Sequence, residues 1–97
     1  MRLRFTPRAT QDLVDIADYF RERSPEAGVR VRTAILASLQ NLVVFPEIGR
    51  RQALPGVRKL ITRKYSYLVY YTVDAAVDEI IVLTIQHPAQ EREYEDA

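Results

Sequence analysis

The sequence predicts an α+β fold in which a helical hairpin packs on a small, mostly antiparallel sheet, in the order β-α-α-β-β-β. Two segments begin with a Thr-Pro or Ser-Pro pair and continue with apolar residues at helical spacing. Two later segments, residues 68–73 and 79–86, consist mainly of the β-branched and aromatic residues that favour strands. The alternating segment at residues 2–5 adds a short strand before the helices.

The first helix is expected to follow Thr6 and Pro7. A threonine side chain accepts a hydrogen bond from the unpaired amides of a helix start, and proline suits the first helical position. The apolar stripe of this helix consists of Ala9, Leu13, Ile16, Ala17 and Phe20. Asp12 and Asp15 lie away from the stripe, which predicts a solvated acidic face for both carboxylates.

The second helix is expected to begin at Ser24 and Pro25 and to run to about Val44. Its inner stripe consists of Val31, Ile35, Ser38, Leu39 and Leu42. A second, roughly opposite side consists of Val29, Leu36 and Val43. A helix that is apolar on two sides packs against two different elements or partners. The first helix and the sheet could supply both, and the alternative is an exposed groove that awaits a partner helix.

The strand at residues 68–73 is expected to be central in the sheet, because neither of its faces carries a charge. One face holds Tyr67, Val69, Tyr71 and Val73, and the other holds Leu68, Tyr70 and Thr72. A turn at residues 74–78 joins this strand to its antiparallel partner at 79–86. In that partner we expect two alternating faces, namely Ile81, Leu83 and Ile85 opposite Ile80, Val82 and Thr84. A further strand is expected at 57–62, after a loop at 50–56, and residues 89–97 form a polar tail.

Size and composition limit the possible functions. The chain has 97 residues and is expected to form one domain, 1–97. It has no cysteine, which fits the reducing cytoplasm, and from its composition we expect neither a membrane-spanning segment nor a secretory signal. His87 is the only imidazole and no acidic cluster surrounds it, so we expect no metal site. Phosphate-binding and dinucleotide-binding motifs are absent, and no cofactor is expected.

The formal net charge is only +1, but basic residues cluster in one stretch. Residues 49–73 contain no acid, and their basic residues are Arg50, Arg51, Arg58, Lys59, Arg63 and Lys64. Such a cluster could contact phosphates or an acidic protein surface, or it could be a solvated surface. Among the neighbouring tyrosines, Tyr70 and Tyr71 are expected in the core, whereas Tyr65 and Tyr67 could also stack on bases.

His87 follows the last strand, with Arg92 and Tyr94 beyond it. A histidine can carry a proton near neutral pH, so these three residues are candidates for acid–base chemistry. The alternative is a structural histidine at the end of a strand.

The chain resembles the RelE/ParE family of bacterial toxins over essentially its whole length. Residues 57–60 and 63–74 (VRKL and RKYSYLVYYTVD) look like the core signature of the family. The turn FPEIGR at 45–50, the opening FTPRA at 5–9 and a last strand that ends in His87 are also similar. The resemblance implies the RelE/ParE-like fold and a toxin that is bound and neutralised by a protein antitoxin encoded beside it.

The family divides into two activities. RelE-like members cut messenger RNA in the ribosomal A site without a metal, using basic residues and a tyrosine near the C-terminus. ParE-like members poison DNA gyrase. This sequence has Tyr67 where the nucleases carry an arginine, Leu60 where they carry a second lysine, and PAQE at 88–91 where they carry a basic cluster. The resemblance is therefore closer to ParE and implies gyrase poisoning. The alternatives are a RelE-like nuclease, which would use His87, Arg92 and Tyr94, and a non-toxic binding module of the same fold.

The expected binding residues form two sets. The set expected to contact the target, gyrase or alternatively the ribosome and its mRNA, is Arg58, Lys59, Arg63, Lys64 and Tyr67. The set expected to contact the antitoxin is Leu13, Phe20, Val29, Leu36 and Val43. The resemblance implies a hetero-oligomer with the antitoxin, and operator DNA is expected to be bound only through that partner.

Overall fold

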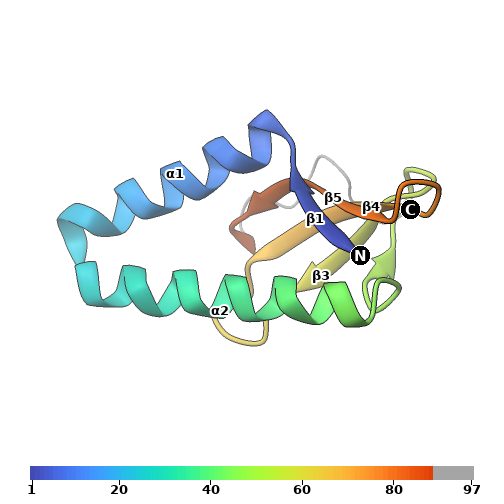
Figure 1. Ribbon diagram of the computed structural model, residues 1–97. Coiled ribbons are helices and arrows are strands. Elements are labelled where there is room, and N and C mark those ends of the chain that lie inside the picture. Colours follow the sequence, from blue (N-terminus) through green and yellow to red (C-terminus); the bar gives the residue numbers. More distant parts are fainter. Residues whose placement is uncertain (89–97) are drawn as a thin grey trace.

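A five-stranded sheet and two helices make up residues 1–88, the part of the chain that this computed structural model describes (Figure 1). The elements follow the order β1 (Arg2–Phe5), α1 (Pro7–Arg23), α2 (Pro25–Val44), β2 (Arg50–Arg51), β3 (Arg58–Ile61), β4 (Leu68–Asp74) and β5 (Glu79–Gln86). The predicted α+β fold with a helical hairpin is confirmed. Neither helix of this part of the chain combines the length and apolarity needed to cross a bilayer.

The strand order in the sheet is β1-β5-β4-β3-β2, so β4 is the central strand, as predicted. β1 runs parallel to β5, and all other neighbours are antiparallel. The strand β2 lies in the segment that was predicted to be a loop. It has only two residues, Arg50 and Arg51, which pair with Lys59 and Arg58 of β3. Two charged residues show no apolar alternation, so the sequence carries no signal for this strand.

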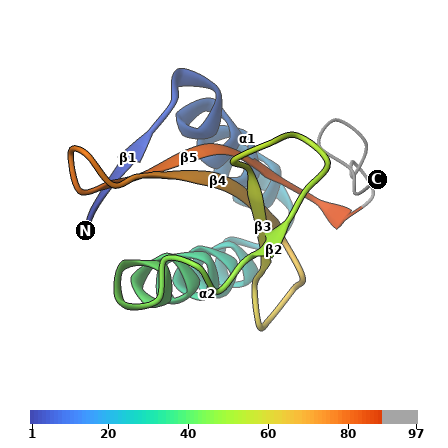
Figure 2. The ribbon, with the colours of Figure 1, turned by 90° about the vertical axis from the view of Figure 1, so that its right-hand side faces the viewer.

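Both helices begin where the sequence predicts. The side chain of Thr6 accepts a hydrogen bond from the amide of Ala9 at 3.0 Å, and that of Ser24 accepts one from Ala27 at 3.3 Å. The hairpin that they form extends beyond the sheet at its closed end (Figure 1). In the view of Figure 2, β4 and β5 run between α1 above and α2 below.

The main core lies between the helices and the sheet. From α2 it contains the predicted inner stripe, with Val31, Ile35, Leu39 and Leu42 all buried, and from the sheet it contains Val69, Tyr71, Ile80, Val82 and Ile85. Tyr70 and Leu68 belong to a second buried cluster with Val57. The two predicted faces of the central strand are therefore confirmed, and both are buried.

The predicted alternation of β5 is wrong at its end. The pairing register between β4 and β5 shifts between Tyr70, which pairs with Thr84, and Tyr71, which pairs with Val82. This bulge leaves Leu83 without a partner in the ladder and reverses the facing of the residues that follow. As a result, Ile85 lies in the main core with Ile80 and Val82. Leu83, which was predicted to share a face with Ile85, packs instead on the second cluster.

The expectation that Asp12 lies on a solvated face is also wrong. Beyond the end of β1, the edge of β5 is completed by Thr6, whose amide donates to the Val82 carbonyl at 3.1 Å. Further along, the Asp12 carboxylate accepts hydrogen bonds from the Thr84 hydroxyl and from the Ile85 amide, the latter at 2.9 Å. The carboxylate thus satisfies the Ile85 amide of β5 at a position where β1 no longer pairs with it. Asp15 is exposed, as predicted.

Candidate functional site

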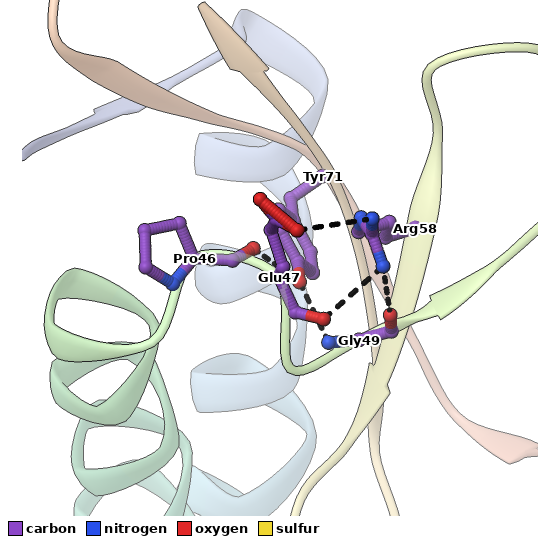
Figure 3. Close-up of polar contacts among 5 residues, drawn as sticks. All are labelled: Pro46, Glu47, Gly49, Arg58 and Tyr71. Atoms are coloured by element: carbon purple, nitrogen blue, oxygen red, sulfur yellow. Dashed lines mark hydrogen bonds and ion pairs between the residues drawn. The ribbon is translucent and has the colours of Figure 1, made fainter. Parts of the chain in front are cut away.

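The turn that ends α2 is fixed to the central strand by the buried hydroxyl of Tyr71 (Figure 3). This hydroxyl accepts a hydrogen bond from the Gly49 amide and donates one to the Pro46 carbonyl, both at 2.8 Å. Burial raises the pKa of Tyr71, and the hydrogen bond from Gly49 and the nearby Arg58 charge only partly oppose this. A side chain at position 49 would place its Cβ 2.6 Å from the Tyr71 ring, so the contact requires glycine.

Arg58 belongs to the same group of contacts. Its guanidinium donates to the carbonyl oxygens of Glu47 at 3.1 Å and Gly49 at 2.9 Å, and it lies 3.9 Å from the Glu47 carboxylate (Figure 3). The Arg58 side chain is only 20% exposed. The structure therefore gives Arg58, one of the five predicted target-binding residues, a structural role in the turn that leads into β2.

The remaining basic residues do not form a single patch. Arg50 and Arg51 are exposed on the edge strand β2, and Lys59 is half-buried on β3. Arg63 and Lys64 are exposed at the other end of β3, in the loop at residues 62–67.

That loop has an unusual and well-fixed backbone. Tyr65 and Ser66 both have positive φ, at 66° and 53°, a region that side chains disfavour. The Thr62 hydroxyl holds the loop closed, because it donates to the Lys64 carbonyl at 2.6 Å and accepts from the Tyr67 amide at 3.0 Å. Arg63, Lys64 and the exposed ring of Tyr65 line a groove of about 580 Å³ between this loop and α2.

A second groove, of about 420 Å³, lies between the two helices. Four of the five residues predicted to contact the antitoxin line it, namely Leu13, Phe20, Val29 and Leu36. The fifth, Val43, is half-buried and does not line it. The exposed fractions of Val29 and Leu36 are 65% and 39%, so the structure brings together an apolar surface that no described residue covers.

A third cleft, of about 570 Å³, surrounds His87. The His87 and Tyr67 rings meet edge to face with centroids 5.8 Å apart, and Asp12, Asp15 and Tyr19 also line the cleft. Tyr67, predicted to bind the target, is only 7% exposed and packs in the main core. Burial, followed by the neighbouring Tyr19, raises its pKa.

The described lining of this cleft contains two carboxylates and neither Arg nor Lys. Arg92 and Tyr94, the other two candidate catalytic residues, lie outside the described residues. Within residues 1–88, no group of three or more His, Asp or Glu side chains is placed to hold a metal ion.

Sequence reasoning missed the contacts of Tyr71 and of Asp12. Gly49 and Pro46 mark a turn, but no spacing rule connects them to Tyr71, which follows 22 and 25 residues later in the chain. For Asp12, the only signal is an acid in the second turn of a helix that directly follows a short strand, and a solvated acid gives the same signal.

Comparison with known proteins gives consistent matches over almost the whole chain. The family model described as the ParE toxin of the type II toxin–antitoxin system, parDE, matches residues 3–92. The putative toxin Y4kP of Sinorhizobium fredii is 29% identical over 90 residues, which cover 93% of this chain and 91% of that protein. Toxin RelE2 of Caulobacter vibrioides is 31% identical over 86 residues, which cover 89% of this chain and 93% of that protein.

Solved structures show the same fold. A chain of the chromosomal ParDE system from P. aeruginosa superposes with a TM-score of 0.76 at 28% identity, covering 90% of this chain and 95% of that one. A chain of the intact E. coli RelBE toxin–antitoxin complex gives a TM-score of 0.62 at 18% identity, covering 94% and 98%.

Proposed function

Because the chain belongs to the ParE toxin family of type II toxin–antitoxin systems, we propose that it inhibits growth by poisoning DNA gyrase and is neutralised by a cognate antitoxin. The proposal places its action in the cytoplasm, where gyrase meets the chromosome. It needs no cofactor and no chemistry by the toxin itself.

The observation that carries the choice of gyrase is the composition of the cleft around His87. Cleaving RNA without a metal requires cations that stabilise the negative charge developing on the phosphate. Asp12 and Asp15 line this cleft, whereas its described lining offers no Arg or Lys. Two carboxylates oppose the approach of a phosphate. Tyr67 and Leu60, which stand where the nucleases of the family carry cations, both pack on the main core.

The second candidate function is ribosome-dependent cleavage of mRNA, as in RelE-like toxins. It is favoured by the 31% identity to a protein named RelE2. In that case His87 would act together with Arg92 and Tyr94, and the cations would have to come from the segment after residue 88.

We also propose that the antitoxin binds in the groove between α1 and α2. The solved structures with the same fold include chains of a ParDE toxin–antitoxin system and of a RelBE toxin–antitoxin complex. In this chain, Phe20, Leu13 and Leu36 offer an apolar surface, and Arg21 and Arg32 line the same groove. This arrangement fits an amphipathic helix with apolar anchors and acidic flanks. An antitoxin segment that folds on binding typically buries about 1,000–3,000 Å². The pair would form a hetero-oligomer in which the antitoxin contacts operator DNA.

Expression of the toxin without its antitoxin, in a bacterial host, tests the proposed target. We expect cells to filament and to induce the DNA-damage response while pulse-labelling shows that bulk translation continues. Prompt arrest of translation with mRNA cuts at the ribosomal A site, and no DNA-damage response, would instead assign the chain to the second candidate function.

A further inference from the structure

The groove between α2 and the loop at 62–67 has a floor of small side chains. Thr33, Ala34, Ala37 and Ser38 of α2 line it, and the loop forms the facing wall. The volume of about 580 Å³ is within the range of clefts that bind ligands in proteins. Because the floor residues are short, a partner segment can lie close to the axis of α2.

Three cations surround this groove. Arg30 projects from α2, and Arg63 and Lys64 project from the loop. All three are exposed, and no carboxylate of the described residues forms an ion pair with any of them. By contrast, Arg2 and Arg4 lie near Glu79 at 3.6 and 3.9 Å. Cations that no described carboxylate neutralises, on two sides of a concave surface, produce a local positive potential that attracts an anion.

The loop wall is held in place before any partner arrives. Tyr65 and Ser66 are kept in the left-handed region, and such conformations persist only where the surroundings enforce them. Here the conformation is enforced by the two hydrogen bonds of the Thr62 hydroxyl and by the backbone hydrogen bond from the Thr62 amide to the Tyr67 carbonyl. A partner would therefore meet Arg63, Lys64 and the exposed Tyr65 ring without the cost of ordering the backbone of this loop.

The chemistry of the groove favours an acidic protein segment over a nucleic acid. The floor presents methyl groups of Ala34 and Ala37, which suit apolar side chains, and the lining from residues 1–88 contains only three cations. Nucleic-acid binding depends on neutralising many phosphates, and the basic footprint that it requires is missing from a chain of net charge +1.

We propose that this groove is the docking site for an acidic segment of the toxin's target protein. In the complex, carboxylates of the segment pair with Arg30, Arg63 and Lys64, and its apolar side chains lie on Ala34 and Ala37. The proposal rests on the proposed function in one respect, namely that the target is a protein. The residues that line this groove and the groove between the helices overlap only at Val29, so target and antitoxin use different surfaces of α2.

The test compares two triple variants that each remove three positive charges. Arg30→Gln/Arg63→Gln/Lys64→Gln alters the groove, and Arg2→Gln/Arg4→Gln/Arg23→Gln alters exposed positions elsewhere. In a gyrase supercoiling assay, we expect the groove variant to need at least about tenfold more protein for half-inhibition, because it loses three complementary charges. The control should stay within about twofold of the wild type, since exposed charges away from a contact contribute little.

A third variant changes the shape of the groove and keeps its charge. Ala37→Leu adds bulk to the floor at an exposed helical position, where leucine is a good helix former. We expect weaker inhibition from this variant as well. If the wild type inhibits gyrase and the groove variant inhibits it as strongly as the control does, the docking proposal is wrong while the proposed function stands.

A binding measurement decides the case in which the wild type does not inhibit gyrase. Fluorescence anisotropy would compare a labelled peptide rich in Glu and Ala with a single-stranded RNA of equal net charge. We expect the wild type and the control variant to bind the peptide more tightly than the RNA, and the groove variant to lose peptide binding. Tighter binding of the RNA, or peptide binding that is unchanged in the groove variant, would overturn the proposal.

Discussion

The phenolic oxygen of Tyr71 lies 2.8 Å from the amide nitrogen of Gly49, and this contact joins the central strand to the turn that ends α2. The same oxygen donates to the Pro46 carbonyl, so one side chain satisfies two backbone groups of the turn. The turn leads directly into β2, the last strand in the order of the sheet.

Replacing the tyrosine tests how much this contact contributes to stability. Tyr71→Phe leaves the Gly49 amide and the Pro46 carbonyl without their partner, which should lower the free energy of unfolding by about 1–3 kcal/mol. Urea unfolding measures the difference. Tyr65→Phe is the matched control, because the Tyr65 ring is 44% exposed, and it should change stability by no more than about 0.5 kcal/mol. Equal effects of the two substitutions would contradict the structural role of Tyr71.

The raised pKa of Tyr71 predicts a loss of stability at alkaline pH. In the unfolded chain a tyrosine loses its proton near the ordinary pKa of 10.0, whereas the buried Tyr71 keeps its proton to higher pH. Above about pH 10 the folded state therefore binds more protons than the unfolded state, and stability falls as the pH rises toward the folded pKa. Unfolding curves at a series of pH values should show this fall in the wild type and in Tyr65→Phe. The fall should be smaller in Tyr71→Phe, and an identical fall in all three proteins would contradict the assignment.

The sequence was sufficient to predict the helix starts, the inner stripe of α2 and the central position of β4. In each case a local signal and the burial pattern agree: Thr6 and Ser24 cap the helices, and both faces of the central strand are apolar. The bulge near Leu83 and the two-residue strand β2 could not be predicted. Both depend on pairing between distant segments, which leaves no periodic trace in either segment alone.

The hydrogen bonds that the Asp12 carboxylate of α1 accepts from β5 give a third prediction. Asp12→Asn replaces the charged acceptor of two hydrogen bonds, from Thr84 and Ile85, and hydrogen bonds to charged groups typically contribute about 1.5–3 kcal/mol each. For the two hydrogen bonds together we expect a loss of stability on the order of 1–3 kcal/mol, because the amide oxygen of an asparagine can still accept a hydrogen bond. Asp15→Asn, one turn further along the same helix, is the control and should be nearly neutral. Thermal unfolding measures the melting temperatures of the two variants. Equal melting temperatures would contradict the role assigned to Asp12.

The candidate binding surfaces were only partly predictable. The apolar outer side of α2 could be read from the spacing of Val29 and Leu36, because helical periodicity determines which residues share a face. The basic stretch was different, since its residues lie on two strands, β2 and β3, and on the loop at residues 62–67. Arg58 has a structural role and Tyr67 is buried, whereas Arg63 and Lys64 meet Arg30 of α2 in a groove that only the tertiary fold creates.

The groove between the helices gives a prediction about neutralisation. Leu36→Glu places a charge in the apolar surface that we propose the antitoxin covers, so co-expressed antitoxin should fail to rescue growth while toxicity remains. Val14→Glu, at an apolar position of α1 that is 46% exposed and does not line the groove, is the matched control and should still be neutralised. Full rescue of Leu36→Glu, or a structure of the complex in which the antitoxin touches neither helix, would contradict this assignment.

The central claim, that this toxin poisons gyrase, is tested most directly by adding the purified protein to purified gyrase with relaxed plasmid and ATP. We predict that the toxin inhibits supercoiling or traps cleaved DNA, that the antitoxin reverses the effect, and that translation in a cell-free extract continues at the same toxin concentration. Unchanged gyrase activity, together with cleavage of mRNA on ribosomes in the same extract, would contradict the account.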